Sequence, residues 1–109
     1  MTRPARPGRH SDAAVVAGVD VDRVAATVAA CPLVAGLDAG DHGTAATLLP
    51  GRRVIGVRVG EPAGGPARIT VTVVARYGAP LTRLVEQVRS AVGVRAPGHP
   101  VDVVVTDVS

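Results

Sequence analysis

The sequence predicts an α+β fold, an α-β-β-α-β sandwich in which two helices pack on one face of a three- to four-stranded mixed sheet. Apolar residues recur at helical spacing in two segments. In three others, apolar residues occupy every second position, as in a strand with one apolar face. The second helical segment lies between two valine-rich stretches. A strand–helix–strand unit within one sheet normally forms a right-handed parallel pair, which accounts for the mixed sheet.

The first helix is expected to begin after Asp20, whose side chain suits the N-cap position. Its apolar stripe consists of Val21, Val24, Ala25, Val28 and Cys31. Pro32 should end this helix, because the residue before a proline is pushed out of the helical conformation. Residues 13–19 before it fit either a short strand or an irregular lead-in.

Strands are predicted in three stretches between the helices. Leu33 to Leu37 is a candidate short strand, and the Gly- and Asp-rich residues 38–45 predict a loop after it. Arg53 to Val59 is predicted as one strand. One face of that strand should carry Ile55, Val57 and Val59. Ile69 to Ala75 alternates β-branched residues with period two, and antiparallel pairing of these last two strands is the simplest arrangement.

The second helix should begin near Pro80, which suits the first helical turn because its missing N–H would be unpaired there. Its apolar stripe consists of Leu81, Leu84, Val85, Val88 and Val92. Gly93 is the expected C-terminal cap, so the helix should stop near Val92. Val101 to Val108 then forms the last strand. One face of that strand should carry Val101, Val103 and Val105.

The chain divides into a tail and one domain. Residues 1–12, with Arg3, Arg6 and Arg9 and two prolines, are predicted to form a disordered Arg/Pro-rich tail, and residues 13–109 a single α+β domain. All 12 basic residues are Arg; without the first ten residues, nine Arg face nine Asp or Glu. The domain itself is therefore neutral, which does not favour a specific nucleic-acid surface.

The predicted core has few large side chains. The chain contains 22 Val and 18 Ala, but no Phe and no Trp. Small side chains bury little apolar area, and each buried Å² contributes only about 25 cal/mol. Because a domain of this size is already marginal, we expect it to be stabilised by self-association or by a partner.

The composition indicates a cytoplasmic protein. Cys31 is the only cysteine, so the chain forms no internal disulfide. No stretch approaches the roughly 20 apolar residues that span a bilayer, and no signal-peptide pattern is present at the start. Any association with a membrane should therefore depend on a partner.

No pattern in the sequence indicates catalysis, a cofactor or a metal site. The three histidines are His10, His42 and His99, and Asp38 and Asp41 precede His42 in a loop without the spacing of metal ligands. Cys31 lies at a helix C-terminus, where the helix dipole disfavours a thiolate. It is better explained as a small buried apolar residue. The chain is therefore predicted not to be an enzyme.

One face of the predicted sheet is neither clearly polar nor clearly apolar, and we identify it as the candidate interaction face. Its members are Arg58, Thr70, Thr72, Val74, Val104 and Thr106. The first interpretation is a solvated face with some exposed valines, since scattered apolar residues on a surface are normal. A surface for self-association is the second interpretation, and the small core favours it.

Several segments resemble the alkaline shock protein 23 family, envelope stress response proteins of Gram-positive bacteria. The resemblance covers residues 20–108 and rests on residues 24–37, on Gly56-Val57-Arg58-Val59-Gly60, on residues 73–88 and on the valine-rich end. The most distinctive motif is Tyr77-Gly78 followed by Pro80. The chain departs from the family in its shorter second helix and in the segment Val94 to Pro100, which replaces the family's usual Thr-Gly.

The resemblance implies a non-enzymatic scaffold with no catalytic residues. It implies a cytoplasmic protein held at the inner face of the cell membrane by a small membrane-anchored partner of the same stress system, and a homo-oligomer.

A KH-like RNA-binding module is the alternative. Gly40-Asp41-His42-Gly43 fits a GxxG loop, which in KH domains clamps backbone phosphates. Here the loop precedes a strand and carries an acid, and Tyr77 is the only aromatic residue available for base stacking.

Overall fold

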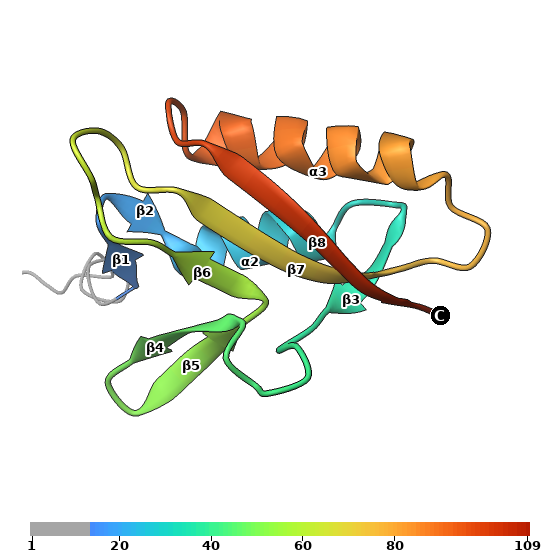
Figure 1. Cartoon of the computed structure of the whole chain (residues 1–109), viewed down its shortest axis with the longest axis horizontal. Helices are drawn as coiled ribbons and strands as arrows, with labels where there is room; N and C mark the ends of the chain where they lie inside the picture. The colour runs from blue at the N-terminus through green and yellow to red at the C-terminus, as the bar shows by residue number, and fades with distance from the viewer. Residues whose placement is uncertain (1–13) are drawn as a thin grey trace, which may run out of the picture.

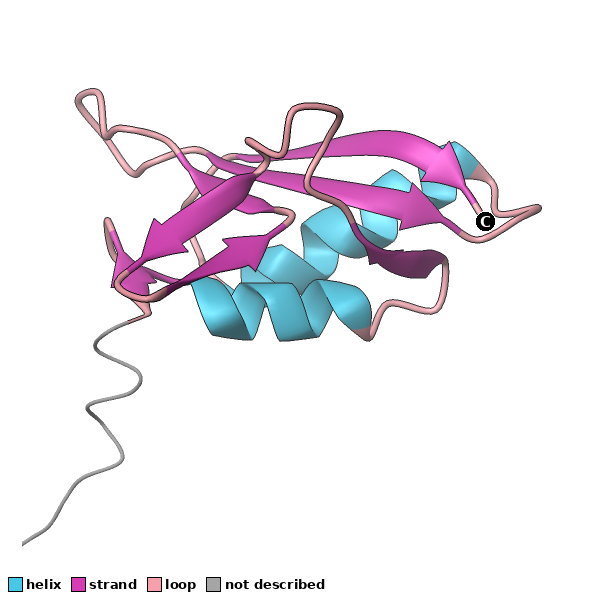
Figure 2. Cartoon of the chain, turned by 90° about the horizontal axis from the view of Figure 1, so that it is seen from below, coloured by secondary structure: helices cyan, strands magenta, loops and turns pink. Residues whose placement is uncertain are grey.

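The sheet is covered on one face by both helices, as Figure 2 shows. The computed structural model describes residues 14–109 (Figure 1), so the predicted tail and His10 lie outside the described residues. The sheet contains β3 (Val34–Leu37), β6 (Val57–Val59), β7 (Ile69–Ala75) and β8 (Val101–Val108), and the helices are α2 (Val21–Ala29) and α3 (Leu81–Arg95). The predicted α+β class with a mixed sheet is confirmed.

Strand β7 is the centre of the sheet. β8 runs parallel to it along its whole length, as the strand–helix–strand pattern predicts. On the other side, β3 and β6 pair antiparallel with different halves of β7 and lie end to end. Thr72 marks their junction: its N–H donates to Gly56 O over 2.8 Å and its carbonyl accepts from Asp38 N over 3.0 Å.

Helix α2 forms as its sequence predicts. The side chain of Asp20 accepts a hydrogen bond from Arg23 N over 3.1 Å, which satisfies one of the free N–H groups of the first turn. Its fully buried residues are Val21, Val24 and Val28.

Helix α3 is longer than predicted and its stripe is narrower. It continues past Gly93 to Arg95, so the expected cap at Gly93 is wrong. Pro97 supplies the physical reason for the end, because it forces Ala96 out of the helical conformation. Leu81, expected in the buried stripe, is 49% exposed. The buried residues of α3 are Leu84, Val88 and Val92.

The predicted strand from Arg53 to Val59 is also wrong as a single element. Gly56 has φ +83°, which turns the chain between β5 (Arg52–Ile55) and β6. β5 pairs with β4 (Ala46–Leu49) in a separate hairpin, while β6 joins the main sheet. Because of this turn, Ile55 is 40% exposed whereas Val57 is fully buried.

The segment before α2 forms a hairpin, which decides between the two interpretations of residues 13–19. β1 (Val15–Val16) and β2 (Val19–Asp20) pair antiparallel. Ala17 and Gly18, with φ of 48° and 82°, make the turn between them. Positive φ at both positions is the geometry of a two-residue type I′ turn, which matches the twist of the strands.

The core lies between the sheet and the two helices, and valines dominate it. Ile69, Val71 and Val73 of β7 are fully buried against this core. None of the helices within residues 14–109 is long and apolar enough to cross a membrane.

Candidate functional site

The candidate interaction face lies on β6, β7 and β8, opposite the helices. Its six residues are Arg58, Thr70, Thr72, Val74, Val104 and Thr106. Pairing between strands brings them into rows, since Arg58 lies beside Thr70 and Thr72 lies beside Val104. The structure therefore places residues from three strands on one surface.

A register shift changes the row at the end of β8. Val73 is opposite Val105 but Val74 is opposite Asp107, so Thr106 is an extra residue in β8. The Thr106 hydroxyl donates to Asp38 Oδ2 over 2.8 Å, which ties the end of β8 to the segment after β3.

The loop of residues 38–45 crosses the middle of this face, and Figure 2 shows it passing the strands on the side away from the helices. Its backbone is held by the bond from Asp38 N to Thr72 O, and Arg58 Nη1 donates to Thr44 O over 3.2 Å. Thr72 is only 4% exposed as a result. The face is therefore divided, and its open parts are the Arg58 end and the Val104 side.

The β8 side of the sheet is open. Val104 is 43% exposed and Val108 is 48% exposed. Within residues 14–109, β7 is the only strand that pairs with β8. Arg68 Nη1 donates to both carboxylate oxygens of Asp102, at 3.0 and 3.1 Å, which neutralises the one acid in the first half of this strand.

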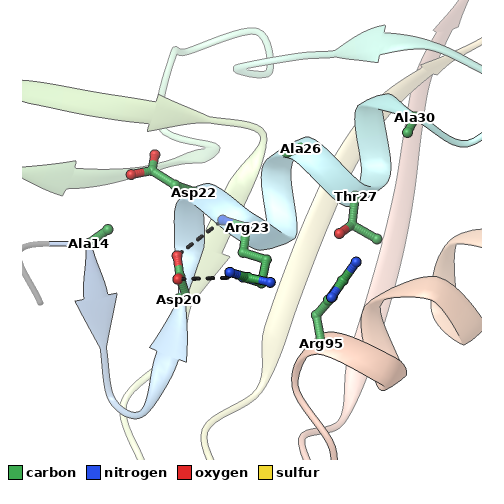
Figure 3. A pocket seen from close by; sticks show the side chains of 8 residues that line it. All are labelled: Ala14, Asp20, Asp22, Arg23, Ala26, Thr27, Ala30 and Arg95. Atoms are coloured by element: carbon green, nitrogen blue, oxygen red, sulfur yellow. Dashed lines mark hydrogen bonds and ion pairs between the residues drawn. The ribbon is translucent and has the colours of Figure 1, made fainter. Parts of the chain in front are cut away.

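A shallow cleft lies between α2 and the end of α3, with Arg23, Thr27 and Arg95 directed into it (Figure 3). Asp20 lies 3.9 Å from Arg23 Nε, so one of the two guanidinium groups already has an acidic neighbour. The cleft gathers no base, nucleophile and acid that could act together.

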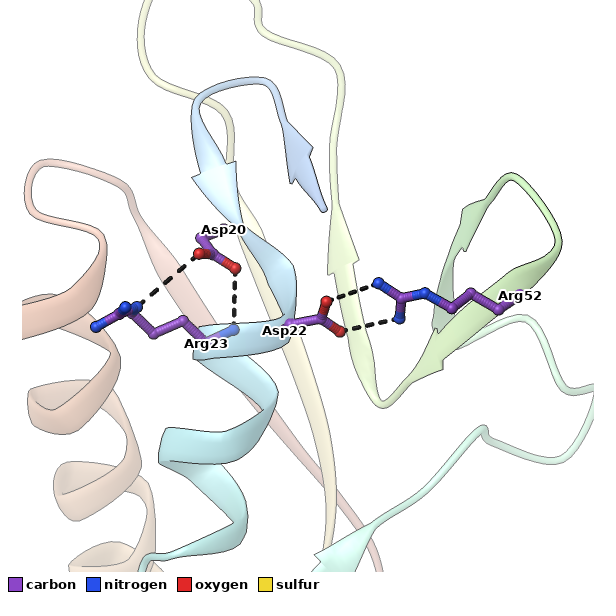
Figure 4. Close-up of polar contacts among 4 residues, drawn as sticks. All are labelled: Asp20, Asp22, Arg23 and Arg52. Carbon is purple, nitrogen blue, oxygen red and sulfur yellow. Dashed lines mark hydrogen bonds and ion pairs between the residues drawn. The ribbon is translucent and has the colours of Figure 1, made fainter. Parts of the chain in front are cut away.

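Asp22 belongs to a separate ion pair on the outer side of α2 (Figure 4). Arg52 donates two hydrogen bonds to its carboxylate, at 3.0 and 2.7 Å. These hydrogen bonds lower the pKa of the Asp22 carboxyl. Because both side chains are about half exposed, the pair attaches the β4–β5 hairpin to α2 without stabilising the fold much.

The residues considered for metal or acid–base chemistry do not come together. Asp41 and His42 are exposed in the loop, whereas Asp38 is engaged with Thr106. His99 Nδ1 lies 2.7 Å from Ala67 O, far along the chain from that loop. In the part of the chain that the structure describes, no three His, Cys, Asp or Glu residues are arranged to hold a metal ion.

Cys31 is buried, with 6% exposure, and its Sγ donates to Thr27 O over 3.5 Å. Burial raises the pKa of the Cys31 thiol, because the thiolate would lose its hydration. The expected role as a small buried apolar residue fits this environment.

The two motifs singled out from the sequence lie in connections. Gly40 to Gly43 is part of the loop before β4 and joins a strand to a strand, unlike the helix-to-helix loop of a KH domain. Tyr77 and Gly78 form the turn between β7 and α3, and Pro80 is the N-cap residue of α3. Tyr77 is 87% exposed, and its N–H donates to Ser109 O over 2.7 Å, which fastens the end of β8.

Comparison of the chain with protein-family models, curated proteins and solved structures finds no match.

Proposed function

We propose that this protein is a non-enzymatic scaffold of the alkaline shock type that supports tolerance of cell-envelope stress. It is a cytoplasmic protein that a small membrane-anchored partner holds at the inner face of the membrane, and it self-associates. The observation that carries the proposal is the one-sided sheet: helices cover one face, while the other face is open at Arg58 and Val104.

The physical support for an interaction domain is the unequal use of the two faces. The helix side buries the large apolar residues, including Ile69 and Leu84, so this side completes the fold. On the other side, Val104 is 43% exposed beside β-branched neighbours, and Thr70 and Val74 are half-buried. A mixed apolar and polar surface of this kind suits a partner that binds and dissociates.

The charge distribution supports a protein partner over a nucleic acid. Residues 11–109 contain as many acids as arginines. Three of the arginines, Arg23, Arg52 and Arg68, have acidic partners within 4 Å. Few phosphates could be neutralised by the domain, and phosphate neutralisation supplies most nucleic-acid affinity.

Co-purification from native membranes tests the proposal. A tagged full-length chain should recover a small membrane-anchored protein from detergent-solubilised membranes. Arg58→Glu, on the open face, should abolish this recovery because it reverses a charge at the contact surface. Arg83→Glu is the matched control, since it makes the same change on the outer side of α3 and should retain the partner. Recovery of no membrane protein by the wild type, or equal loss with both variants, would contradict the proposal.

A further inference from the structure

The outer edge of β8 has a short stretch of backbone with no partner among residues 14–109. Ile69 N donates to Pro100 O, and Thr70 and Thr72 lie opposite Asp102 and Val104. In a parallel pair, alternate residues direct their N–H and C=O groups to the neighbouring strand. The residues between these, at positions 101, 103 and 105, therefore direct theirs away from β7.

At each end of this outer edge, a side chain already binds one backbone group. At the start, Arg89 Nε of α3 donates to Val101 O over 3.2 Å. At the end, Val108 N donates to the Asp107 carboxylate over 2.7 Å. Val103 and Val105 lie between these two contacts, and among residues 14–109 no bond to the outward N–H or C=O group of either is present. An exposed strand edge with such groups is a template for pairing with another strand.

We infer that this edge pairs antiparallel with β8 of a second copy of the chain, across a two-fold axis at Val104. This inference rests on the proposed self-association and names its surface. In this register, Val103 of each copy exchanges two hydrogen bonds with Val105 of the other. The four bonds use the outward N–H and C=O groups of Val103 and Val105 in both edges, and they leave the contacts of Val101 O and Val108 N in place.

The self-complementary sequence is the reason to choose a second copy as the occupant. The antiparallel register sets Asp102 opposite Thr106 and Val101 opposite Asp107 of the second copy, so no acids face each other. Arg89, already bound at Val101 O, then lies near the Asp107 that arrives from the second copy. Parallel pairing in register would set Asp102 against Asp102, and like charges directly opposite are destabilising.

Shifting the antiparallel register by two residues in either direction brings a less suitable residue into the paired segment. A two-fold axis at Val103 would pair Val105 with Val101, whose carbonyl accepts from Arg89. An axis at Val105 would pair Val103 with Asp107, which lies beyond the register shift that interrupts the regular ladder of β8. The register centred on Val104 avoids both pairings. It also covers the Val104 side chain, which is 43% exposed in the single copy.

Charge exchange at Val104 tests the inference. The two Val104 residues would form a directly opposed pair with a Cα separation of about 4.5 Å. Val104→Asp and Val104→Arg should each shift the sedimentation of the full chain to the monomer, because like charges then meet at the axis. An equimolar mixture of the two should restore the dimer. Dimers that persist in both single variants, or a mixture that stays monomeric, would overturn the inference.

Cysteine cross-linking tests the same register through the appearance of a covalent dimer rather than through the loss of a dimer. Val104→Cys should form a cross-linked dimer under mild oxidation, because the opposed Cα atoms lie within disulfide range. Val108→Cys is the matched control, with 48% exposure against 43%, and lies outside the paired segment. Equal cross-linking of the two would overturn the register.

The two proposals can fail separately. If the membrane partner co-purifies but these tests fail, the scaffold function is supported and pairing through the β8 edge is not. If these tests succeed but no membrane partner is recovered, pairing through the β8 edge is supported and the scaffold function is not.

Discussion

Gly56 shows how one residue determines the position of the open surface. Its φ of +83° turns the chain from the β4–β5 hairpin into β6. A Cβ atom there would lie 2.7 Å from Leu37 Cβ and 2.9 Å from Thr72 O. Both distances are shorter than van der Waals contact allows, so the positive φ and the lack of space each require glycine here.

Replacing Gly56 with Ala should therefore destabilise the fold by about 2–5 kcal/mol, the sum of left-handed strain and overpacking. Gly51→Ala is the matched control. Gly51 has φ +76° but no heavy atom within 4 Å of its added Cβ, so only the strain of about 1–2 kcal/mol should appear. Urea unfolding measures both free energies, and equal losses would contradict the close approach to Leu37.

The contribution of Cys31 to the free energy of unfolding should depend on pH. Burial raises its pKa, so the folded chain keeps the thiol proton after the unfolded chain has released it. This contribution to stability is fully present below about pH 8.5, the ordinary pKa of a thiol, and is lost as the pH rises through the higher folded pKa.

The Cys31→Ala variant isolates that effect. The fall in unfolding free energy between neutral and alkaline pH should be smaller in the variant than in the wild type. The native thiol should also react slowly with iodoacetamide and quickly in denaturant. A thiol that reacts equally fast in both conditions would contradict its burial.

Among the secondary-structure elements, helix α3 packs on the core through residues that its apolar spacing predicts. Leu84 is fully buried between the helix and the sheet, whereas Arg83 is exposed. Leu84→Ala should lower the free energy of unfolding by about 2–5 kcal/mol, the usual cost of a large-to-small change in a core. Arg83→Ala should cost less than about 0.5 kcal/mol. Denaturant unfolding that gives equal losses for the two would show that the helix has another register.

Sequence patterns predict the elements that are determined by interactions between residues close together in the chain. The N-cap at Asp20, the buried positions of α2 and the alternation of β7 all follow from spacing and residue type. Gly93 predicts too early an end for α3, because a glycine within a helix is tolerated, whereas Pro97 forces the residue before it out of the helical conformation. The β4–β5 hairpin was missed although Pro50 and Gly51 mark its turn.

The candidate surface was predicted less completely, because its shape depends on contacts between distant residues. Period two predicts Thr70 and Thr72 on the face away from the core, but it does not predict that Thr70 is half-buried while Thr72 is only 4% exposed. The loop that covers Thr72 is held by a bond between Asp38 and Thr106, 68 residues apart, and no local pattern encodes it. The same applies to the bond from Arg89 to Val101 O, which caps the edge of β8.

At the scale of the whole molecule, charge is unevenly distributed along the chain. The first ten residues carry three arginines and no acid, and the rest of the chain is neutral. Deleting these ten residues should abolish salt-dependent retention on RNA or DNA columns, because few phosphates could then be neutralised. Retention that survives the deletion and weakens when Gly40 to Gly43 is altered would instead support RNA binding by the loop.

Self-association would account together for the small core, the one-sided sheet and the open edge of β8. Sedimentation equilibrium of the wild-type chain over a range of micromolar concentrations tests it most directly. We expect a reversible equilibrium between monomer and dimer, with the dimer increasing as concentration rises. A single monomeric species at every concentration would contradict it.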